Sequence, residues 1–383
     1  MSAIELLIIL ILLFMAVPDL CRLLRRPALI YPAFVIFGLL IGPFVQLEVS
    51  TMLQQAGQIG FLLLLFEVGL EIDLPRPRQL AQPALYTLRW LLIQYPIVLA
   101  LARFAGLPWM ESLVGAAAIT GCSVGMAHSA WKSYPGLETD NRTFVLRVMV
   151  LLEMVAIVLL AVETPLMDTK AVWWQILLKL LGTGLAVFLC SRAASHLSRL
   201  FQKTLEKTTQ WRIHFVILLV LAVCAAGERL GLSGPKMAFF LGLFMSRVKH
   251  DEKNLEEYLA PISQRFLIPI FFVVLGMEIP LPFLLSRAGL VALVAAATLL
   301  IVREIMHRRW LPTGGDGRTH LLLSPNLTIA ALAGNSMLKA DADPQHAAWV
   351  ILTGLFMTVI AIFTLPAPKK ITAESAGDAT PVH

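Results

Sequence analysis

The chain has 383 residues, of which 58% are hydrophobic and only 15% are charged. Because soluble domains carry about 25% charged residues, this composition excludes an ordinary soluble protein and indicates a membrane protein. The net charge of +6 does not indicate nucleic-acid binding, since the basic residues stand in short loops between apolar runs and form no stripe interleaved with aromatic side chains.

The four cysteines are scattered through the chain, at Cys21, Cys122, Cys190 and Cys224. They show neither a CxxC spacing nor a companion histidine cluster, so they predict neither a disulfide framework nor a zinc site. No cofactor is expected. The first residues, MSAIE, are acidic, and the apolar run behind them lacks a small-residue cleavage site. This run therefore predicts a retained first helix and not a signal peptide.

Apolar segments of about 20 residues, the length that spans a bilayer, recur thirteen times along the chain. The segment at 233–247 is short for a span. The segment at 318–338 is interrupted twice, at Ser324-Pro325-Asn326 and at Gly334-Asn335-Ser336. This succession predicts an all-α membrane protein with about 13 transmembrane helices. The segments are 3–20, 29–46, 51–70, 83–104, 109–131, 142–163, 171–198, 212–230, 233–247, 257–279, 281–309, 318–338 and 346–366.

Basic residues concentrate in every second loop, as the positive-inside rule describes for cytoplasmic loops. This asymmetry predicts an N-terminus outside, a cytoplasmic C-terminus and a short polar cytoplasmic tail at 368–383. The basic-rich loops hold twenty basic residues: Arg22, Arg25, Arg26, Arg76, Arg78, Lys132, Arg142, Arg192, Arg199, Lys203, Lys207, Arg212, Arg247, Lys249, Lys253, Arg308, Arg309, Arg318, Lys369 and Lys370. The other loops hold four: Lys170, Arg229, Lys236 and Lys339.

The stretch 116–162 carries the strongest functional signal. It reads as two apolar helices, of which the first is interrupted by Thr-Gly-Cys-Ser-Val-Gly and the second carries Glu153 near its middle. A helix broken at membrane depth exposes backbone groups that protein or a water-filled cavity must satisfy, and secondary transporters bind ions at such breaks. A charged carboxylate at the bilayer centre costs about 2.5–3.5 kcal/mol or more. The two features together predict an ion site.

Four stretches resemble the second cation-proton-antiporter family, which contains bacterial Na+/H+ and glutathione-gated K+/H+ exchangers. They are FLLLLFEVGLEID (61–73), TGCSVGM (120–126), GLSGPKMAFFLGLFMS (231–246) and LEEYLAPISQRFLIPIFFVVLGMEI (255–279). The last is the most specific, because it combines Pro269, an aromatic pair and a Gly-Met-Glu ending. The resemblance covers nearly the whole membrane region and identifies the chain as similar to monovalent cation/proton antiporters.

The resemblance implies an antiporter fold with inverted repeats and two crossing broken helices. It also implies a homodimer in a bacterial inner membrane. The implied organisation is a scaffold and dimerisation bundle at 1–82 and 205–280, an ion-transport core at 83–166 and 281–367, a linking helix at 167–204 and a cytoplasmic tail at 368–383.

Three positions depart from the family pattern. Family members carry an acidic or amide residue beside the acid in the helix after the break, where this chain has Leu152 followed by Glu153. Arg303 stands where many members have a lysine. The family's Pro-Arg-Gly-Glu run is replaced by Pro-Asn-Leu-Thr at 325–328, so both charges are absent. The resemblance therefore implies a site with a single ion-binding carboxylate.

A single carboxylate holds a proton or a cation but not both well, which predicts exchange of Na+ or K+ for H+ by alternating access. Hydroxyls of Thr120 and Ser123, with exposed carbonyls, are hard ligands suited to an alkali cation, and with Glu153 they form the predicted transient metal site. One ionisable carboxylate predicts one proton per cation, and hence electroneutral transport. The candidate ion-binding residues are Glu153, Thr120, Ser123, Cys122, Arg303, Asn326 and Thr328.

Each of these residues also has a structural interpretation. Glu153 and Arg303 could form a permanent pair that pins two helices. Arg303 could instead extend to the cytoplasmic headgroups. Thr120 and Ser123 are residue types that commonly pack between membrane helices.

Two other functions are compatible with the same fold. The chain could carry an organic anion by Na+ symport, with Lys236 or Arg103 assisting, because exposed helix N-termini suit carboxylates. It could also be a transport-inactive sensor or partner subunit, given the absent charges at Leu152, Asn326 and Thr328. An enzyme is not expected, since the sequence shows no nucleophile–base pair, metal cluster or phosphate loop.

Overall fold

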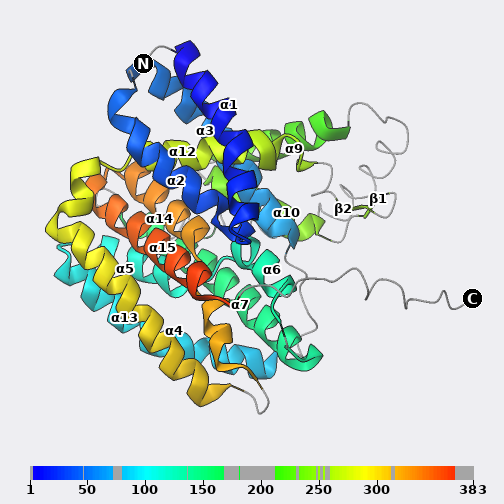
Figure 1. Cartoon of the computed structure of the whole chain (residues 1–383), viewed down its shortest axis with the longest axis vertical. Helices are drawn as coiled ribbons and strands as arrows, with labels where there is room; N and C mark the ends of the chain where they lie inside the picture. Colours follow the sequence, from blue (N-terminus) through cyan, green and yellow to red (C-terminus); the bar gives the residue numbers. More distant parts are fainter. Residues whose placement is uncertain are drawn as a thin grey trace, which may run out of the picture.

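The computed structural model describes residues 3–45, 47–71, 80–135, 137–167, 181, 212–229, 233–246, 249–250, 253–254, 259–311 and 315–366. Its helices gather into one bundle (Figure 1). The regular structure within the described residues is helical except for two short paired strands, β1 (Lys249–His250) and β2 (Lys253–Asn254). The prediction of an all-α membrane fold is confirmed.

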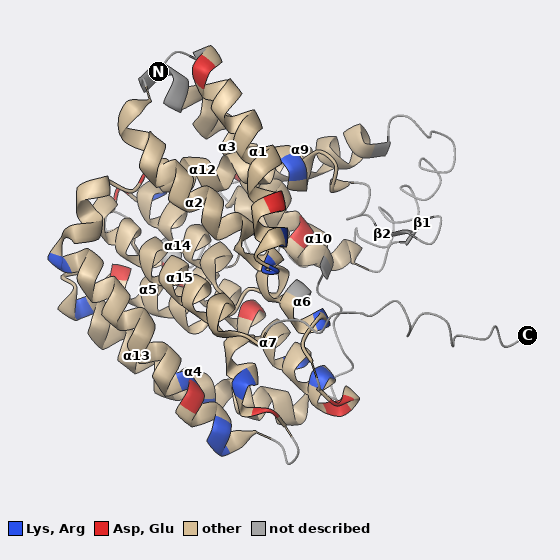
Figure 2. Cartoon of the chain, in the orientation of Figure 1, with Lys and Arg blue, Asp and Glu red and all other residues tan. Residues whose placement is uncertain are grey.

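Eight of the described helices are long and apolar enough to cross a membrane, and two further apolar helices are shorter. Charged residues are sparse over the body of the bundle and gather toward its lower edge, where α4 and α7 begin and α13 ends (Figure 2). Large apolar side chains on α1, such as Ile4 and Met15, are exposed. In water this exposure would cost free energy, whereas lipid solvates it. The chain is a multi-pass membrane protein.

One group of helices packs around α3. Within it α3 lies against α10 and α12, and α2 lies against α12. The group comprises α1 (Ala3–Leu23), the 3-10 turn η1 (Pro27–Leu29), α2 (Ile30–Ile41), η2 (Gly42–Phe44), α3 (Leu47–Glu71), α9 (Arg212–Arg229), α10 (Gly234–Met245), the π-helical turn η5 (Ser263–Leu267) and α12 (Ile268–Met277).

A second group consists of two units of the same design, each with a long helix, a broken helix and a second long helix. The units pack against each other through α5 and α14 and through α4 and α13. The first unit is α4 (Ala81–Phe104), α5 (Trp109–Thr120), α6 (Val124–Lys132) and α7 (Thr139–Glu163), followed by η4 (Thr164–Met167). The second is η6 (Leu281–Leu285), α13 (Arg287–Trp310), η7 (Gly317–Leu321), α14 (Leu327–Lys339) and α15 (Pro344–Thr364).

Twelve of the thirteen predicted apolar segments coincide with these elements. The remaining segment, 171–198, lies outside the described residues apart from residue 181. The predicted linking helix at 167–204 and the tail at 368–383 also fall outside them, except for residues 167 and 181.

Glycines let α2 and α12 approach backbone to backbone. A Cβ atom on Gly38 would stand 1.9 Å from the Val273 carbonyl oxygen, and one on Gly276 would stand 2.1 Å from the Val35 carbonyl oxygen. Small residues at such crossings are typical of membrane helices, where dispersion contacts replace the hydrophobic effect as the source of association. This reciprocal contact fixes α2 on α12.

Candidate functional site

The first broken helix is interrupted between α5 and α6. Residues 121–123 are not helical, and Gly121 has an extended backbone with φ −72° and ψ 178°. A Cβ atom on Gly121 would stand 2.7 Å from the Cβ of Ala156 in α7 and 3.0 Å from the Ile329 side chain in α14. A residue without a side chain therefore lets the break pass between α7 and α14.

The second broken helix is interrupted at residues 322–326, between η7 and α14. The predicted interruption at Ser324-Pro325-Asn326 is confirmed, since these residues lie outside both helices. The helix is broken here because Pro325 lacks an N–H and restricts the backbone of the residue before it. The predicted interruption at Gly334-Asn335-Ser336 is wrong, since these residues lie inside the continuous helix α14. Gly334 serves packing instead, as a Cβ atom there would stand 2.7 Å from the Ile351 side chain.

The two breaks contact each other. The Ser123 amide donates a 2.7 Å hydrogen bond to the Pro325 carbonyl. The Asn326 side-chain amide donates to the Ile119 carbonyl over 3.0 Å, and the Cys122 thiol lies 3.5 Å from the Leu322 carbonyl. Each broken helix thus satisfies backbone groups that the other leaves exposed.

Glu153 in α7 lies directly beside the first break and is completely buried. Its Oε2 accepts a 3.1 Å hydrogen bond from the amide of Val124, the first residue of α6. This helix end carries a partial positive charge that favours a carboxylate. Its Oε1 has no hydrogen-bond partner, and no cationic side chain among the described residues lies within 4 Å of the carboxylate.

Arg303 is completely buried and does not pair with Glu153. Its guanidinium donates to the Ile119 carbonyl over 2.7 Å, which lies in the last turn of α5. It also donates to the carbonyls of Leu323 and Ser324, over 3.2 Å and 3.3 Å. Arg303 therefore compensates the negative helix ends of both broken helices. The permanent pair with Glu153 and the extension to headgroups are both excluded for this conformation.

The other predicted site residues divide into satisfied and unsatisfied groups. The Thr120 hydroxyl donates to the Ala116 carbonyl of its own helix over 2.8 Å. By contrast, Ser123 Oγ, Asn326 Oδ1 and Thr328 Oγ1 are buried and have no hydrogen-bond partner in the part of the chain that the structure describes. The crossing thus brings Ser123 beside the Glu153 carboxylate, while the Thr120 hydroxyl is committed to its own helix.

These unsatisfied oxygens suit a hard cation. Leaving a buried acceptor without a partner costs about 1–3 kcal/mol, and alkali cations prefer carboxylate, hydroxyl and carbonyl oxygens. Protonation of Glu153 is the other way to neutralise the site. The arrangement can therefore hold either a cation or a proton at Glu153.

Three functional neighbours escaped the sequence analysis. Gln94 in α4 is completely buried, and its Oε1 accepts from Arg303 Nε over 2.8 Å. The Trp90 ring lies under the same guanidinium, 5.2 Å from its centroid to the guanidinium carbon. The Thr358 hydroxyl accepts from the Asn326 amide over 3.1 Å. The sequence could have indicated Gln94, because it is a polar residue inside the apolar run LLIQYPIV.

A second chain of polar groups connects α4, α13 and η7. The Thr319 hydroxyl donates to the Asp316 carbonyl over 2.7 Å, so His307 Nε2, 2.6 Å away, must act as donor to it. His307 Nδ1 lies 2.5 Å from the Tyr86 hydroxyl, within hydrogen-bond distance. The chain ties α4 to α13 and η7.

The chain resembles known sodium/proton antiporters in sequence and in fold. It is 26% identical to the probable Na+/H+ antiporter 3 of Methanocaldococcus jannaschii, over 92% of this chain and 90% of that protein. It is also 26% identical to the putative Na+/H+ antiporter YjbQ of Bacillus subtilis, over 97% of this chain and 63% of that protein. The solved structure of the sodium proton antiporter MjNhaP1 from M. jannaschii at pH 8 matches 94% of this chain and 98% of its own, with a TM-score of 0.72 at 17% identity.

A family model described as the transmembrane sodium/hydrogen exchanger matches residues 8–367. This match covers both groups of helices and both breaks. The chain therefore belongs to the sodium/hydrogen exchanger family.

Proposed function

We propose that this protein exchanges a monovalent cation, Na+ or K+, for a proton, with Glu153 as the carboxylate that the two ions share. The observation that carries the proposal is the state of that side chain. It is fully buried beside the crossing, one oxygen accepts a hydrogen bond from the α6 N-terminus, and the other has no hydrogen-bond partner among the described residues. Membership in an exchanger family makes the chain a transporter rather than an enzyme.

The cost of a bare charge supplies the exchange rule. An ionised carboxylate without a counter-ion in the protein interior costs several kcal/mol. A bound proton or a bound alkali cation removes this cost, so both neutral forms are favoured over the bare form. If the site changes sides only in a neutral form, cation flux is coupled to proton flux.

Arg303 is not a counter-ion for Glu153, so the carboxylate still requires a proton or a cation to be neutralised. Its donors are engaged by Gln94 and by carbonyls at the ends of the broken helices. The position before Glu153 holds Leu152, which is buried and has no ionisable group. One proton therefore exchanges for one cation, and transport is electroneutral. A transport current that reverses with membrane voltage in proteoliposomes would contradict this stoichiometry.

The two helix groups of the fold suit the two moving parts that alternating access requires. We assign the group around α3 to the scaffold, 1–82 and 205–280, and the two broken-helix units to the core, 83–166 and 281–367. The close resemblance of four sequence stretches supports placement in the second cation-proton-antiporter family. A homodimer in a bacterial inner membrane, with a cytoplasmic C-terminus, completes the proposal.

Symport of an organic anion finds no support at the crossing. One of the two cationic residues that suggested it, Arg103, donates to the Leu107 carbonyl at 2.5 Å. The other, Lys236, lies 3.4 Å from the Ala161 carbonyl. Arg103 thus contacts the loop between α4 and α5, and Lys236 contacts the last turn of α7, both away from the breaks.

The test uses everted membrane vesicles from a bacterial strain that lacks its own antiporters. Addition of Na+, K+ or Li+ to respiring vesicles should raise the fluorescence of a pH-sensitive dye. We expect Glu153→Gln to abolish this response and Glu67→Gln, a matched change of another buried carboxylate, to retain it. Loss in neither variant, or no response to any cation from well-folded wild-type protein, would overturn the proposal.

A further inference from the structure

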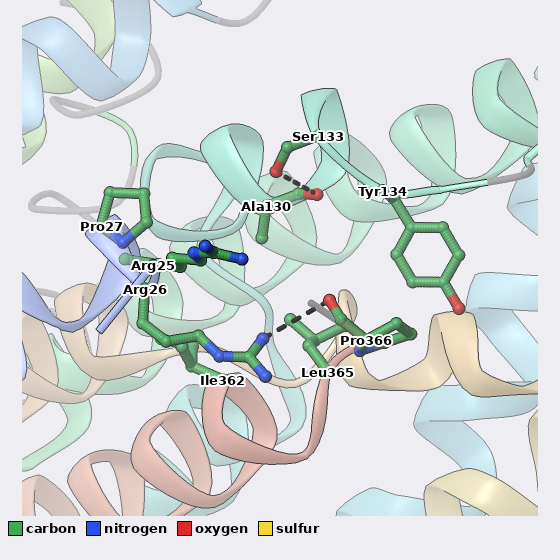
Figure 3. Close-up of a pocket in the computed structure, with 10 residues that line it drawn as sticks. Arg25, Arg26, Pro27, Ala130, Ser133, Tyr134, Ile362, Leu365 and Pro366 are labelled. Carbon is green, nitrogen blue, oxygen red and sulfur yellow. Dashed lines mark hydrogen bonds between the residues drawn. The ribbon is translucent and has the colours of Figure 1, made fainter. Parts of the chain in front are cut away.

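A pocket opens at the seam between the two helix groups, away from the ion site (Figure 3). Arg25 and Arg26, in the turn after α1, line it from the first group. Ala130 and Tyr134 line it from the end of α6, and Ile362 lines it from the last turn of α15. The pocket is thus shared by three elements that are distant in sequence.

The backbone at Arg25 is unusual for its residue type. Arg25 has φ +54°, its amide donates to the Arg22 carbonyl, and the Arg26 amide donates to the Cys21 carbonyl. This pair of hydrogen bonds is the Schellman ending of a helix, in which glycine is the favoured residue at the left-handed position. An arginine in this conformation is strained, and backbone strain of this kind is typical of ligand-binding and other functional positions.

The two guanidinium groups differ in how they are engaged. Arg26 donates to the Phe363 carbonyl over 3.3 Å and to the Pro366 carbonyl over 3.5 Å, and so caps the end of α15. Arg25 is exposed and forms no hydrogen bond or ion pair with any described residue. Figure 3 shows both side chains extending into the same space. The Tyr134 hydroxyl donates to Asp316. No carboxylate of the described residues lies within 4 Å of either guanidinium, so neither arginine is neutralised by an ion pair there.

We propose that this pocket binds a phosphate group, carried by an anionic lipid headgroup or free in solution. Paired arginines are the side chains that recognise phosphate, because their planar N–H donors match its oxygens. Ala28, Ile362 and Leu365 form apolar walls beside these donors. By the positive-inside rule the pocket also lies on the cytoplasmic side, where anionic lipid is concentrated.

A phosphate held here contacts both helix groups at once. Because the exchange cycle moves one group against the other, the bound phosphate favours the conformation in which the pocket is closed, and it restrains transport. This consequence rests on the proposed function. Binding of phosphate to the pocket does not rest on the proposed function, so binding is tested separately from transport.

The experiment measures the thermal midpoint, Tm, of the full chain in a neutral detergent. The probes are dioctanoyl phosphatidylglycerol, dioctanoyl phosphatidylcholine and inorganic phosphate, with choline chloride at matched ionic strength. We expect phosphatidylglycerol, inorganic phosphate or both to raise Tm by several degrees, and neither phosphatidylcholine nor chloride to do so. A rise with phosphatidylglycerol alone assigns the site to a lipid headgroup, and a rise with inorganic phosphate assigns it to free phosphate.

Arg25→Gly is the decisive variant, because glycine fits φ +54° and the change relieves backbone strain. Its Tm without ligand should equal or exceed that of the wild type, while the ligand-induced rise should fall to less than half. Arg22→Gln removes the same charge one turn away, where Arg22 forms an exposed ion pair with Asp19, and should keep the rise. Glu153→Gln should also keep it, whatever that variant does to transport.

Three results would overturn the proposal. They are no rise in the wild type with either phosphate probe, a full rise in Arg25→Gly, or an equal loss in Arg22→Gln and Arg25→Gly. An equal loss in the two variants would mean that the rise in Tm comes from general electrostatic attraction and not from binding in this pocket.

Discussion

The amide of Val124 donates a 3.1 Å hydrogen bond to Oε2 of Glu153, so the carboxylate of α7 caps the first turn of α6. One side chain therefore serves both as a structural cap and as the proposed ion ligand. The cap requires an oxygen acceptor, whereas ion exchange requires a titratable one. Replacing Glu153 by glutamine separates the two roles, because the amide keeps the acceptor and loses the charge.

The two hydroxyls of the first break should differ in their contribution to transport. Ser123 Oγ has no hydrogen-bond partner within the described ranges, whereas the Thr120 hydroxyl is committed to the Ala116 carbonyl. We expect Ser123→Ala to raise the cation concentration for half-maximal exchange by about tenfold, the equivalent of about 1.4 kcal/mol, with little change in Tm. Thr120→Val, the matched control, should leave this concentration within about twofold. Equal effects of the two changes would exclude Ser123 as a ligand.

Arg303 should be essential for the stability of the crossing. Its removal strands the carbonyls of Leu323 and Ser324 in the interior, at about 1–3 kcal/mol each, and takes one of two hydrogen bonds from the Ile119 carbonyl, which keeps the one from Asn326. Arg303→Gln should therefore lower the free energy of unfolding by more than about 3 kcal/mol. Arg287→Gln changes an exposed arginine of the same helix, which lies over the Phe104 ring, and should cost less than about 1 kcal/mol. Unfolding monitored by tryptophan fluorescence compares the two, and similar losses would contradict the assignment.

Two glycines of α3 give a matched test of the helix packing. A Cβ atom on Gly60 would stand 2.0 Å from the Leu267 carbonyl oxygen, whereas the nearest atom to one on Gly57 lies at 3.4 Å. Gly60→Ala should cost about 1–3 kcal/mol through overpacking, and Gly57→Ala should be nearly neutral. If Tm falls equally in both variants, α3 does not pack on η5 as described.

A pH-dependent contact holds the loop after α6 to η7. Partial burial alone would raise the pKa of the Asp316 carboxyl, but hydrogen bonds from Arg318 and Tyr134 hold it below its ordinary value. A lowered pKa stabilises the fold above the unfolded value of about 3.9, and this stability is lost as the pH falls below that value. Asp316→Asn should therefore lower Tm at neutral pH, and the difference from wild type should shrink as the pH falls below the unfolded pKa of about 3.9 and vanish below the lowered pKa of the folded state.

The control for this contact is Asp19→Asn. Asp19 forms an ion pair with Arg22 in which both side chains are more than three-quarters exposed, at 78% and 77%. Exposed pairs contribute little to stability, so Tm should be unchanged at either pH. A pH-independent loss in Asp316→Asn would show that the contact does not depend on the carboxylate charge.

The span pattern and the first break were predictable because they depend on local chemistry. An apolar run of about 20 residues indicates a membrane helix directly. The Thr-Gly-Cys-Ser-Val-Gly run at 120–125 consists of residues with low helix propensity. The second break was ambiguous in sequence, since both Ser324-Pro325-Asn326 and Gly334-Asn335-Ser336 resemble interruptions. Proline removes a donor at any position, whereas the effect of glycine depends on what packs against it. For Gly334 that neighbour is Ile351, from another helix.

The partners of Arg303 could not be predicted. Its contacts reach Gln94, Ile119 and Ser324, and these come from three elements brought together by the crossing. The sequence offered Glu153 as the obvious counter-charge, because opposite charges in lipid are expected to pair. Helix-end carbonyls satisfy an arginine as well, and their position follows from the fold alone.

The most direct test of the account is proton release on cation binding. Purified protein in weakly buffered detergent solution, with a pH indicator, receives Na+ or K+ as chloride, and choline chloride serves as the control. The wild type should release protons that approach one per chain at saturation and take them up again when the cation is removed. Glu153→Gln should release none while keeping a wild-type Tm. Undiminished release from this variant, or cation binding to the wild type without any proton release, would contradict a carboxylate shared by the two ions.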